Sequence, residues 1–544
     1  MFASTTSHDG ARGSVTVRRG SASPRAVGIW LELSDASLAD AHGEGLIRWV
    51  RALISGFDQV PEVGTIVIPC AVGSRHLVER LFAADEGPAD GPRALVSTKL
   101  HIMAVGRDQR RALELRAWFG RRRKAWQERL AGYGVSTNPL TWAVGQRPLV
   151  ATIPSSLGLL LAIAGRLRRT VMATVGLGML EVLRPLLPRG RPVFEDIAAD
   201  LHGRTGDILW IVPDPGWEAA LGLPGRLVVN VADIVYREYP LLGVPPATIR
   251  AHQRGLAALA ERAEAVVCFS EYVARRQVRP ALAGSERPVV VVPHAPLVTP
   301  AADVDEATSR RHLARDLRRH FATSVQGGPH RFFCDFPFER VDYLLVSSKC
   351  RPYKNYAGAI DAYECVLRRH RRDVKLVVTG ALSSDPALGA ELARRGLVFD
   401  VVEATNLPEP IHARLLRHAR ALVIPTFFEG AMPFGFAEAV GVGTPVAFSR
   451  IPVVEELLTD AELAAPEAFV PADVDGMVSA ILHVLDHPAE VLARQRLVYA
   501  RLGRRTWADV ARDYLACGEA SAAPHSRLRR LLGGSGASPR RRAG

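Results

Sequence analysis

The sequence predicts an α/β protein of two Rossmann-like domains, each a doubly wound parallel sheet, that face each other across a cleft. At 544 residues the chain exceeds one ordinary hydrophobic core, so two domains are expected. Short apolar runs alternate with helical patterns on both sides of a polar stretch, which is typical of parallel sheets covered by helices. We therefore expect an N-terminal domain over 26–300, a linker over 301–340, a C-terminal domain over 341–500 and a final helix over 501–518.

The strands are predicted from apolar runs of the length that buried parallel strands have. In the N-terminal domain these runs are AVGIWLEL (26–33), GTIVIPC (64–70), RALVSTKL (93–100), GDILWIVP (206–213), RLVVNVAD (226–233), AEAVVCFS (263–270) and PVVVVPH (288–294). In the C-terminal domain they are DYLLVSS (342–348), DVKLVVTG (373–380), LVFDVVEA (397–404), ALVIP (421–425) and PVAFS (445–449). Ligands of such sheets bind beyond the carboxyl ends of the strands, so a site is expected in the loops that follow these runs.

One segment, 149–189, departs from this alternation because it is apolar and basic with few acidic residues. It belongs to a predicted helical insertion over 135–200. Its longest uncharged run, 149–165, contains Pro154 and two serines, so it is too short and too broken to span a bilayer. Two interpretations stay open: a pair of buried helices, or a basic amphipathic surface that rests on anionic lipid.

The basic charge of the chain is concentrated at its ends. The net charge is +13, and residues 521–544 alone carry six arginines and no acidic residue. We expect disordered tails over 1–25 and 519–544. The chain has no RNA-recognition motif, zinc-finger spacing or basic-aromatic stripe, so nucleic acid is not an expected partner.

The six cysteines are scattered and include no C-x-x-C pair. A disulfide framework and a cysteine-based metal site are therefore not expected. The N-terminus lacks the apolar segment of a secretory signal. Together these features predict a reducing, cytoplasmic location.

Three cations follow the first predicted strand of the C-terminal domain: Lys349, Arg351 and Lys354. Like charges at the mouth of a crevice are unfavourable unless an anion lies among them. A diphosphate fits well, because arginine can bind two oxygens at once and lysine adds a point charge. A solvated turn is the alternative, but the position at a strand end favours phosphate binding.

The stretch PTFFEGAMPFGFAEAVGVGTP (425–445) predicts a strand end, a loop, a short helix and the next strand. Phe434 and Gly435 precede the helix, whose first amides suit a phosphate. Glu438 lies about one turn into the helix, where a carboxylate can accept both hydroxyls of a ribose. Glu429, at the loop start, could accept hydroxyls of a group beyond the phosphates. Spacing alone favours ordinary surface or capping roles for both glutamates.

In combination, these motifs resemble the retaining glycosyltransferases of family 4, which have the GT-B fold. The resemblance covers about 340–515 well and 26–300 more weakly, where GEGLIRWVRALI (43–54) resembles the family's glycine-rich first loop and helix. The C-terminal motifs stand in the family's order and at similar distances: RPYKN, RHARALVIPTFFEG, AEAVGVGTPV, SRIPVVEELL, FVPADVDGMVSAI and RRTWADVARDYL.

The resemblance implies a nucleoside diphosphate sugar as the ligand. Arg351 and Lys354 match the diphosphate-binding pair, and Phe434 and Gly435 precede amides that add to it. Glu438 matches the ribose-binding glutamate, and Glu429 matches the catalytic glutamate that meets the donor sugar. Such enzymes need no metal ion or other cofactor, because cations and helix amides stabilise the leaving diphosphate.

Four further residues are expected in the cleft. Gly43 and Gly45 would let the N-terminal backbone approach the donor phosphate closely. Asp233 is expected in the N-terminal wall of the cleft. Gly380 suits a nucleobase pocket.

The implied function is transfer of a hexose to a saccharide or lipid-linked acceptor, in polysaccharide or glycoconjugate synthesis. The implied location is the cytoplasm, and peripheral contact with the inner membrane surface stays open. Two features depart from the family pattern: eight residues separate Glu429 from Glu438 where seven are usual, and Ala232 stands where many members have a histidine. They keep open a catalytically silent nucleotide-sugar-binding protein, or an assembly scaffold, as the alternative.

Overall fold

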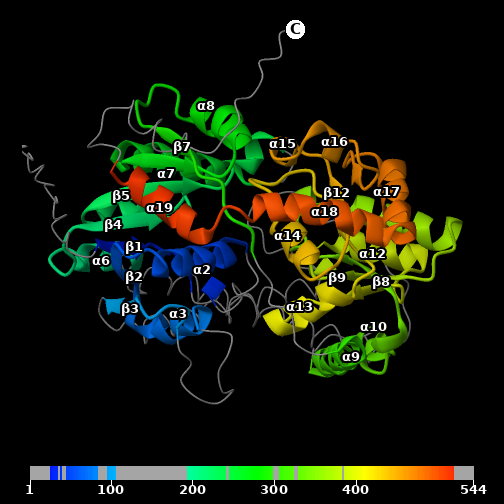
Figure 1. Cartoon of the computed structure of the whole chain (residues 1–544). Coiled ribbons are helices and arrows are strands. Elements are labelled where there is room, and N and C mark those ends of the chain that lie inside the picture. Colours follow the sequence, from blue (N-terminus) through cyan, green and yellow to red (C-terminus); the bar gives the residue numbers. More distant parts are fainter. Residues whose placement is uncertain are drawn as a thin grey trace, which may run out of the picture.

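Two parallel β-sheets organise this computed structural model (Figure 1). The structure describes residues 25–34, 37–38, 45–83, 95–105, 193–239, 244–297, 305–323, 329–382 and 385–519. One sheet has seven strands in the order β3-β2-β1-β4-β5-β6-β7, and the other has six in the order β10-β9-β8-β11-β12-β13. Neighbouring strands are parallel throughout. The order reverses between β1 and β4 and again between β8 and β11, which confirms the doubly wound, two-domain fold class.

The N-terminal domain contains the seven-stranded sheet. Its strands are β1 (Arg25–Ile29), β2 (Val63–Ala71), β3 (Leu100–Val105), β4 (Ile208–Val212), β5 (Arg226–Val231), β6 (Ala265–Cys268) and β7 (Val289–Val291). Its described helices are α2 (Gly45–Asp58), α3 (Arg75–Leu81), α6 (Val193–Asp200), α7 (Pro246–Arg262) and α8 (Arg279–Ala281), with a π-helical turn at Val273–Val278.

The C-terminal domain contains the six-stranded sheet. Its strands are β8 (Tyr343–Val346), β9 (Lys375–Val378), β10 (Val401–Glu403), β11 (Ala421–Ile424), β12 (Val446–Ser449) and β13 (Ala468–Phe469). Its described helices are α9 (Glu306–Thr323), α10 (Pro329–Cys334), α11 (Tyr356–Glu364), α12 (Pro386–Arg395), α13 (Glu409–His418), α14 (Phe434–Gly441), α15 (Pro452–Glu455), α16 (Asp460–Leu463), α17 (Val474–Asp486) and α18 (Pro488–Leu502). The last helix of the chain is α19 (Trp507–Cys517).

The third strand of the N-terminal sheet lies later in the sequence than predicted. The apolar run 93–100 suggests a strand, but β3 begins only at Leu100. Ser97 Oγ donates to Asp58 Oδ1 at 2.6 Å, and Lys99 Nζ donates to the Asp58 carbonyl at 2.6 Å. These side-chain bonds hold a turn against the end of α2, so the chain can enter the sheet only after it.

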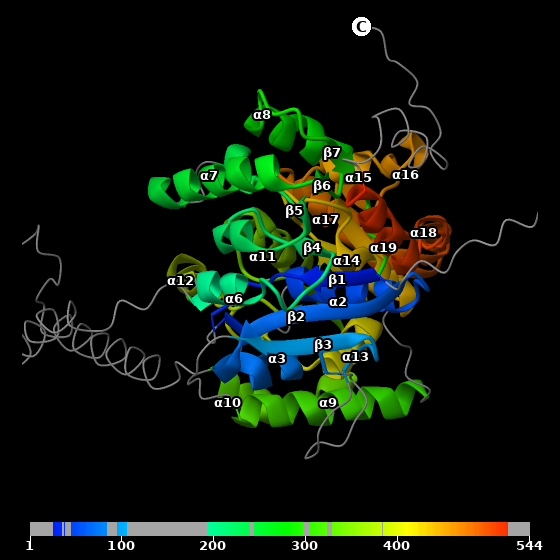
Figure 2. The same ribbon diagram turned by 90° about the vertical axis from the view of Figure 1, so that its left-hand side faces the viewer.

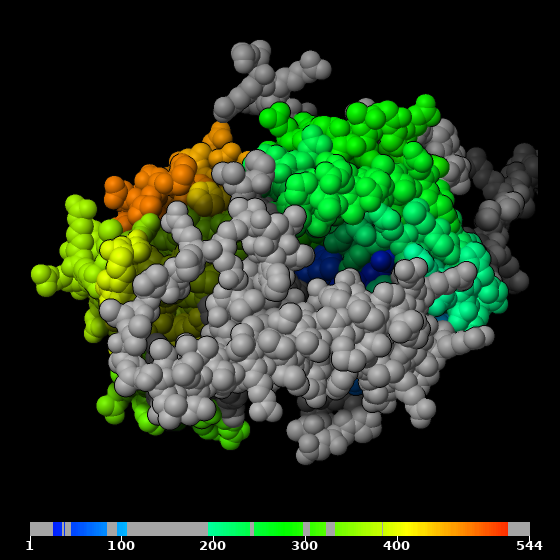
Figure 3. All heavy atoms as spheres, turned by 180° about the vertical axis from the view of Figure 1, so that it is seen from behind, coloured from blue at the N-terminus to red at the C-terminus, as the bar shows by residue number. Residues whose placement is uncertain are grey.

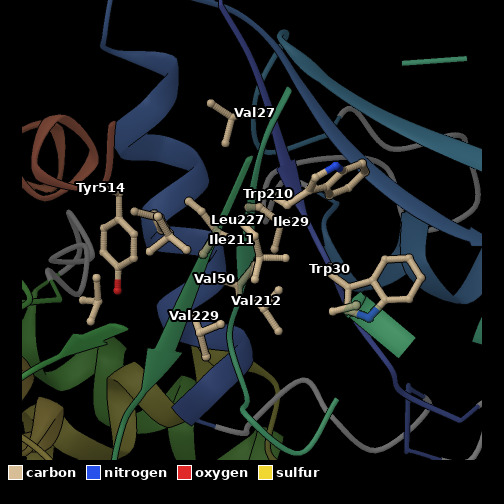
Figure 4. Packing of buried hydrophobic residues seen from close by; sticks show 14 of the residues in the cluster. Val27, Ile29, Trp30, Val50, Trp210, Ile211, Val212, Leu227, Val229 and Tyr514 are labelled. Carbon is tan, nitrogen blue, oxygen red and sulfur yellow. The ribbon is translucent and has the colours of Figure 1, made fainter. Parts of the chain in front are cut away.

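The core of the N-terminal domain includes two buried tryptophans, Trp210 in β4 and Trp30 directly after β1 (Figure 4). The indole rings of Trp30 and Trp210 meet edge to face, with centroids 6.4 Å apart. Gly28 lies beside Trp210, and a Cβ on Gly28 would fall 2.2 Å from the indole. Every residue of β4 is buried, as expected for a strand with helices on both faces.

The sequence predicts a linker over 301–340. The residues of this segment that the structure describes belong to the C-terminal domain. Leu313, Leu317 and Phe321 of α9 are buried in one hydrophobic cluster with Tyr343 of β8 and Leu415 of α13. Figure 2 shows α9 and α10 at one end of the molecule, below α13. The segment looks polar in sequence because α9 is amphipathic, with arginines on its outer face.

The last helix returns to the N-terminal domain, where α19 packs against α2 (Figure 1). Tyr514 Oη donates to the Asn230 amide oxygen at 2.8 Å, and both residues are fully buried. Trp507 Nε1 donates to the Pro296 carbonyl at 3.0 Å. The final helix therefore ties the end of the C-terminal domain to the N-terminal sheet.

The two domains also meet at the rim between α15 and the π-helical turn. The Glu456 carboxylate accepts hydrogen bonds from the backbone amides of Glu271, at 2.9 Å, and Tyr272. Burial raises the pKa of Glu456, and the two amides partly offset that rise. From behind, the green surface of the N-terminal domain lies beside the orange surface of the C-terminal domain at this rim (Figure 3).

Three expectations concern residues outside the described ranges. The tails over 1–25 and 519–544 lie outside them except for one residue each. Most of the insertion expected over 135–200 also lies outside, including the apolar and basic segment 149–189, and only its end forms α6.

Removal of the Tyr514 hydroxyl should weaken the docking of α19. In Tyr514→Phe the buried Asn230 oxygen loses its donor, and an unpaired buried polar group costs about 1–3 kcal/mol. Urea unfolding followed by tryptophan fluorescence should show that loss in the free energy of unfolding. The control Tyr499→Phe alters a half-buried residue of α18 and should change it by less than about 0.5 kcal/mol; equal losses in both variants would contradict the role of this bond.

Candidate active-site cleft

All the predicted C-terminal residues except Gly380 follow β8 or β11 in the chain. These two strands are neighbours in the sheet, but the chain leaves them toward opposite sides, β9 on one and β12 on the other. The loops after β8 and β11 therefore diverge and leave a crevice between them, the usual ligand position in a doubly wound sheet. Lys354 follows β8, and Glu429 follows β11.

Asn355 fixes the loop that carries Lys354. It has a left-handed backbone (φ 55°), and its side chain accepts a hydrogen bond from the Gly358 amide, which caps α11. Its amide nitrogen donates to the Pro425 carbonyl at 3.1 Å. The Tyr353 carbonyl accepts the Phe427 amide at 2.8 Å. The loops after β8 and β11 are thus hydrogen-bonded together, and the position of Lys354 is set before any ligand binds.

Lys354 and Glu429 form an ion pair, with Nζ and Oε1 2.5 Å apart. Their side chains are only 16% and 21% exposed. Burial would lower the pKa of Lys354, but the Glu429 charge and hydrogen bond outweigh it and hold the pKa above its usual value. Lys354 therefore stays charged in a partly dehydrated cleft.

Asp233, from the N-terminal domain, faces this ion pair. Its carboxylate accepts the Val235 amide at 3.1 Å. The pKa of Asp233 is raised to about 6, chiefly by burial; the Glu429 charge adds to the rise, and the Val235 amide and the Lys354 charge oppose it. The structure thus brings Asp233, Lys354 and Glu429 within electrostatic reach across the domain boundary.

The loop after β11 rests directly on the N-terminal domain. The Gly430 carbonyl accepts a hydrogen bond from Ser270 Oγ at 3.0 Å, and the Phe427 carbonyl accepts one from Tyr239 Oη at 2.9 Å. A Cβ on Gly430 would fall 2.2 Å from the Ala232 carbonyl oxygen, so only glycine fits there. The longer glutamate spacer and Ala232, the two departures from the family pattern, therefore meet at one contact.

Glu438 lies in α14 with 4% of its surface exposed. Its Oε1 pairs with the guanidinium of Arg48, which lies in the N-terminal helix α2. Sequence reasoning missed Arg48. In the sequence, Arg48 is marked only by its position in the first turn of the helix that follows the glycine-rich segment. That position does not identify an ion-pair partner 390 residues away.

The sequence predicts Phe434 and Gly435 just before the helix, but α14 begins at Phe434 and contains both residues. The Phe434 ring faces the N-terminal domain. It packs on the imidazole of His294, with ring centroids 4.4 Å apart. Burial lowers the pKa of His294 to about 4, so the ring is neutral at physiological pH. His294 Nδ1 donates to the Ala295 carbonyl at 3.1 Å. His294 is a second cleft residue that sequence reasoning did not single out.

The remaining predicted residues have different surroundings. Gly380 packs closely, because a Cβ there would fall 2.5 Å from Tyr356 Oη and 2.7 Å from the Cys350 amide. Gly45 is the first residue of α2, and Gly43 lies outside the described residues. Arg351 is exposed at the start of the Lys354 loop, so the expected diphosphate pair has one buried and one exposed member.

No described helix has the length and apolarity needed to cross a bilayer. Within the described ranges, no group of three or more histidine, cysteine or acidic side chains is arranged to hold a metal ion.

Part of the chain is similar in sequence to known proteins. Residues 341–487 match the family model described as Glycosyl transferases group 1. A segment of 121 residues is 35% identical to glycogen synthase of Mycobacterium tuberculosis; it is 21% of this chain and 28% of that protein, so the match spans under a third of the relative's length.

The fold is similar to a solved structure, the N-terminal domain of Candida albicans trehalose-6-phosphate phosphatase. The TM-score is 0.51 at 12% identity, over 91% of this chain and 97% of that one. The match to the Glycosyl transferases group 1 model thus lies within the C-terminal domain, and the two-domain architecture is that of the GT-B fold.

The raised pKa of Asp233 predicts a pH dependence of stability. The folded pKa is about 6 and the unfolded value is about 4, so the folded protein holds this proton more tightly. The contribution of Asp233 to stability is therefore most favourable below about pH 4 and is lost as the pH rises through about 6. Asp233→Asn resembles the protonated form at every pH, so its melting temperature relative to wild type should rise from pH 4 to pH 7.

The corresponding gain in free energy of unfolding is at most about 3 kcal/mol. Asp207→Asn is a suitable control, since Asp207 is 77% exposed and should show no comparable rise above pH 5. A difference between Asp233→Asn and wild type that is constant from pH 4 to pH 7 would contradict the assignment.

Proposed function

We propose that the protein is a retaining glycosyltransferase of family 4, which moves a hexose from a nucleoside diphosphate sugar to a saccharide or lipid-linked acceptor. Its role would be polysaccharide or glycoconjugate synthesis in the cytoplasm, with at most peripheral contact to the inner membrane surface. The observation that carries the proposal is the cluster of Lys354, Glu429 and Asp233 at the domain boundary, within a region that matches Glycosyl transferases group 1.

The charges in the cleft suit the parts of such a donor. The diphosphate would lie against Lys354, with Arg351 at the open side, and the first amides of α14 would add hydrogen bonds. The ribose hydroxyls would donate to Glu438. The hexose would then lie near Glu429 and Asp233, whose carboxylates can accept its hydroxyls. Gly380 would lie in the nucleobase region.

Transfer would proceed without a protein nucleophile. The acceptor hydroxyl attacks the anomeric carbon from the face that the diphosphate leaves; the new C–O bond forms as the bond to phosphate breaks. The proton of the acceptor passes to the leaving phosphate oxygen. Lys354, Arg351 and the α14 amides stabilise the charge that develops on the diphosphate. We propose that no metal ion or other cofactor takes part, so activity should survive EDTA.

The alternative is a catalytically silent nucleotide-sugar-binding protein or an assembly scaffold. The observation that favours it is that both key carboxylates, Glu429 and Glu438, have cationic partners within the chain itself. Both functions predict nucleotide binding, so only turnover distinguishes them.

A panel of nucleotide sugars tests the proposed function. We expect one donor to release free UDP or GDP slowly without acceptor and in the presence of EDTA. Lys354→Ala and Arg351→Ala should each lower the rate at least about thirtyfold, equivalent to about 2 kcal/mol for a charge-assisted contact. Arg75→Ala alters an exposed pair on α3 and should leave the rate unchanged. Nucleotide binding with no release from any donor, even with saccharide acceptors added, would favour the silent protein.

Glu429→Gln should separate binding from catalysis. The variant keeps the shape of the side chain but loses the charge beside the donor sugar. We expect turnover to fall about a hundredfold, the scale of losing one electrostatic contact in an active site. The dissociation constant of the free nucleotide, measured by calorimetry, should change far less. A turnover equal to wild type would show that the donor sugar does not lie against Glu429.

A further inference from the structure

Arg48 of the N-terminal domain is paired with Glu438, the carboxylate to which the proposed function assigns the ribose hydroxyls. Its guanidinium pairs with Glu438, and the two side chains are 26% and 6% exposed. Burial lowers the pKa of Arg48, and the charge of Glu409 opposes the change. This is therefore a partly dehydrated ion pair that joins α2 of one domain to α14 of the other.

The guanidinium also lies near the start of α14. Its central carbon is 5.9 Å from the centroid of the Phe434 ring, and Phe434 is the first residue of that helix. Arg48 thus stands between two parts of the expected donor site, the ribose carboxylate and the amides suited to a phosphate.

His412 borders the same place. Its Nε2 lies 2.7 Å from Ser347 Oγ, at the carboxyl end of β8. Burial, together with the Arg48 charge, lowers the pKa of His412 to about 4. His412 is therefore neutral at physiological pH and adds no charge beside the Arg48 cation.

The physics of buried charge limits what can happen when a nucleotide enters. A dehydrated guanidinium that loses its carboxylate needs another anion, because an unpaired buried charge is strongly unfavourable. Two ribose hydroxyls can replace it as donors to Glu438. The diphosphate of the same ligand would bring a new anion into the cleft, and arginine suits it through paired hydrogen bonds.

We propose that Arg48 is a donor-binding residue supplied by the N-terminal domain, which exchanges Glu438 for the donor's diphosphate when the ribose binds. The exchange makes the bound donor part of the contact between the domains. This inference rests on the proposed function, since it requires a nucleotide at Glu438.

The test compares a nucleoside with its diphosphate. Uridine and UDP, and guanosine and GDP, are titrated into the full-length chain and into Arg48→Gln. The glutamine amide can still donate to Glu438, so the carboxylate is not left unpaired. We expect Arg48→Gln to lose at least tenfold in affinity for the diphosphate of the preferred base. Its affinity for the nucleoside should be unchanged or higher, because the guanidinium no longer competes for Glu438.

Two further variants guard against a purely structural effect. Arg48→Lys keeps the charge and should retain part of the preference for the diphosphate. Arg51→Gln alters the same helix one turn on, where the guanidinium donates to the carbonyls of Leu81 and Ala83. It should leave the ratio of the two affinities as in wild type.

The outcomes separate this inference from the function beneath it. If wild type binds neither UDP nor GDP, the proposed function fails and the inference fails with it. If wild type binds one of them but Arg48→Gln shows the wild-type ratio of nucleoside to diphosphate affinity, the inference alone is overturned. A parallel loss of affinity for both ligands overturns it as well.

Discussion

Two ion pairs at one cleft, Lys354–Glu429 and Arg48–Glu438, are the interactions on which the candidate site depends. Three of the four side chains are less than 22% exposed, and Glu438 is almost fully enclosed. Isolated charges in such places are unfavourable, so each requires its partner. Such partners can be exchanged for a ligand that carries both phosphates and hydroxyls. In our interpretation the ion pairs hold the charged side chains of the cleft in position until a nucleotide sugar binds and replaces these contacts.

The same cleft exists only while the two domains are in contact. Arg48 and Asp233 come from the N-terminal domain, and Lys354, Glu429 and Glu438 come from the C-terminal domain. Hydrogen bonds from Ser270 and Tyr239 hold the loop after β11 against the N-terminal domain, and α19 returns across the boundary to α2. The interface thus sets the distances between groups on opposite walls. A change in domain contact would alter the ion pairs and the donor site together.

Sequence reasoning predicted the parts of this arrangement that depend on local pattern. The alternation of apolar runs and helices gave the two sheets, and the position of Lys354 and Glu429 after neighbouring strands placed them at one crevice. It did not predict the partners of those residues, because an ion pair such as Arg48–Glu438 depends on the angle between domains and leaves no periodic signal. The same limit applies to α9, which looks polar in sequence because of its arginines although its other face is buried in the C-terminal core. It also applies to β3, whose start at Leu100 depends on the side-chain hydrogen bonds of Ser97 and Lys99 in the preceding turn.

A crystal structure of the full chain with the nucleoside diphosphate of its preferred donor tests the central claim most directly. The proposed function predicts the ribose hydroxyls on Glu438, the diphosphate between Lys354 and the start of α14, and Glu429 facing the space for the hexose. A nucleotide bound elsewhere, with the Lys354–Glu429 and Arg48–Glu438 pairs both intact, would contradict it.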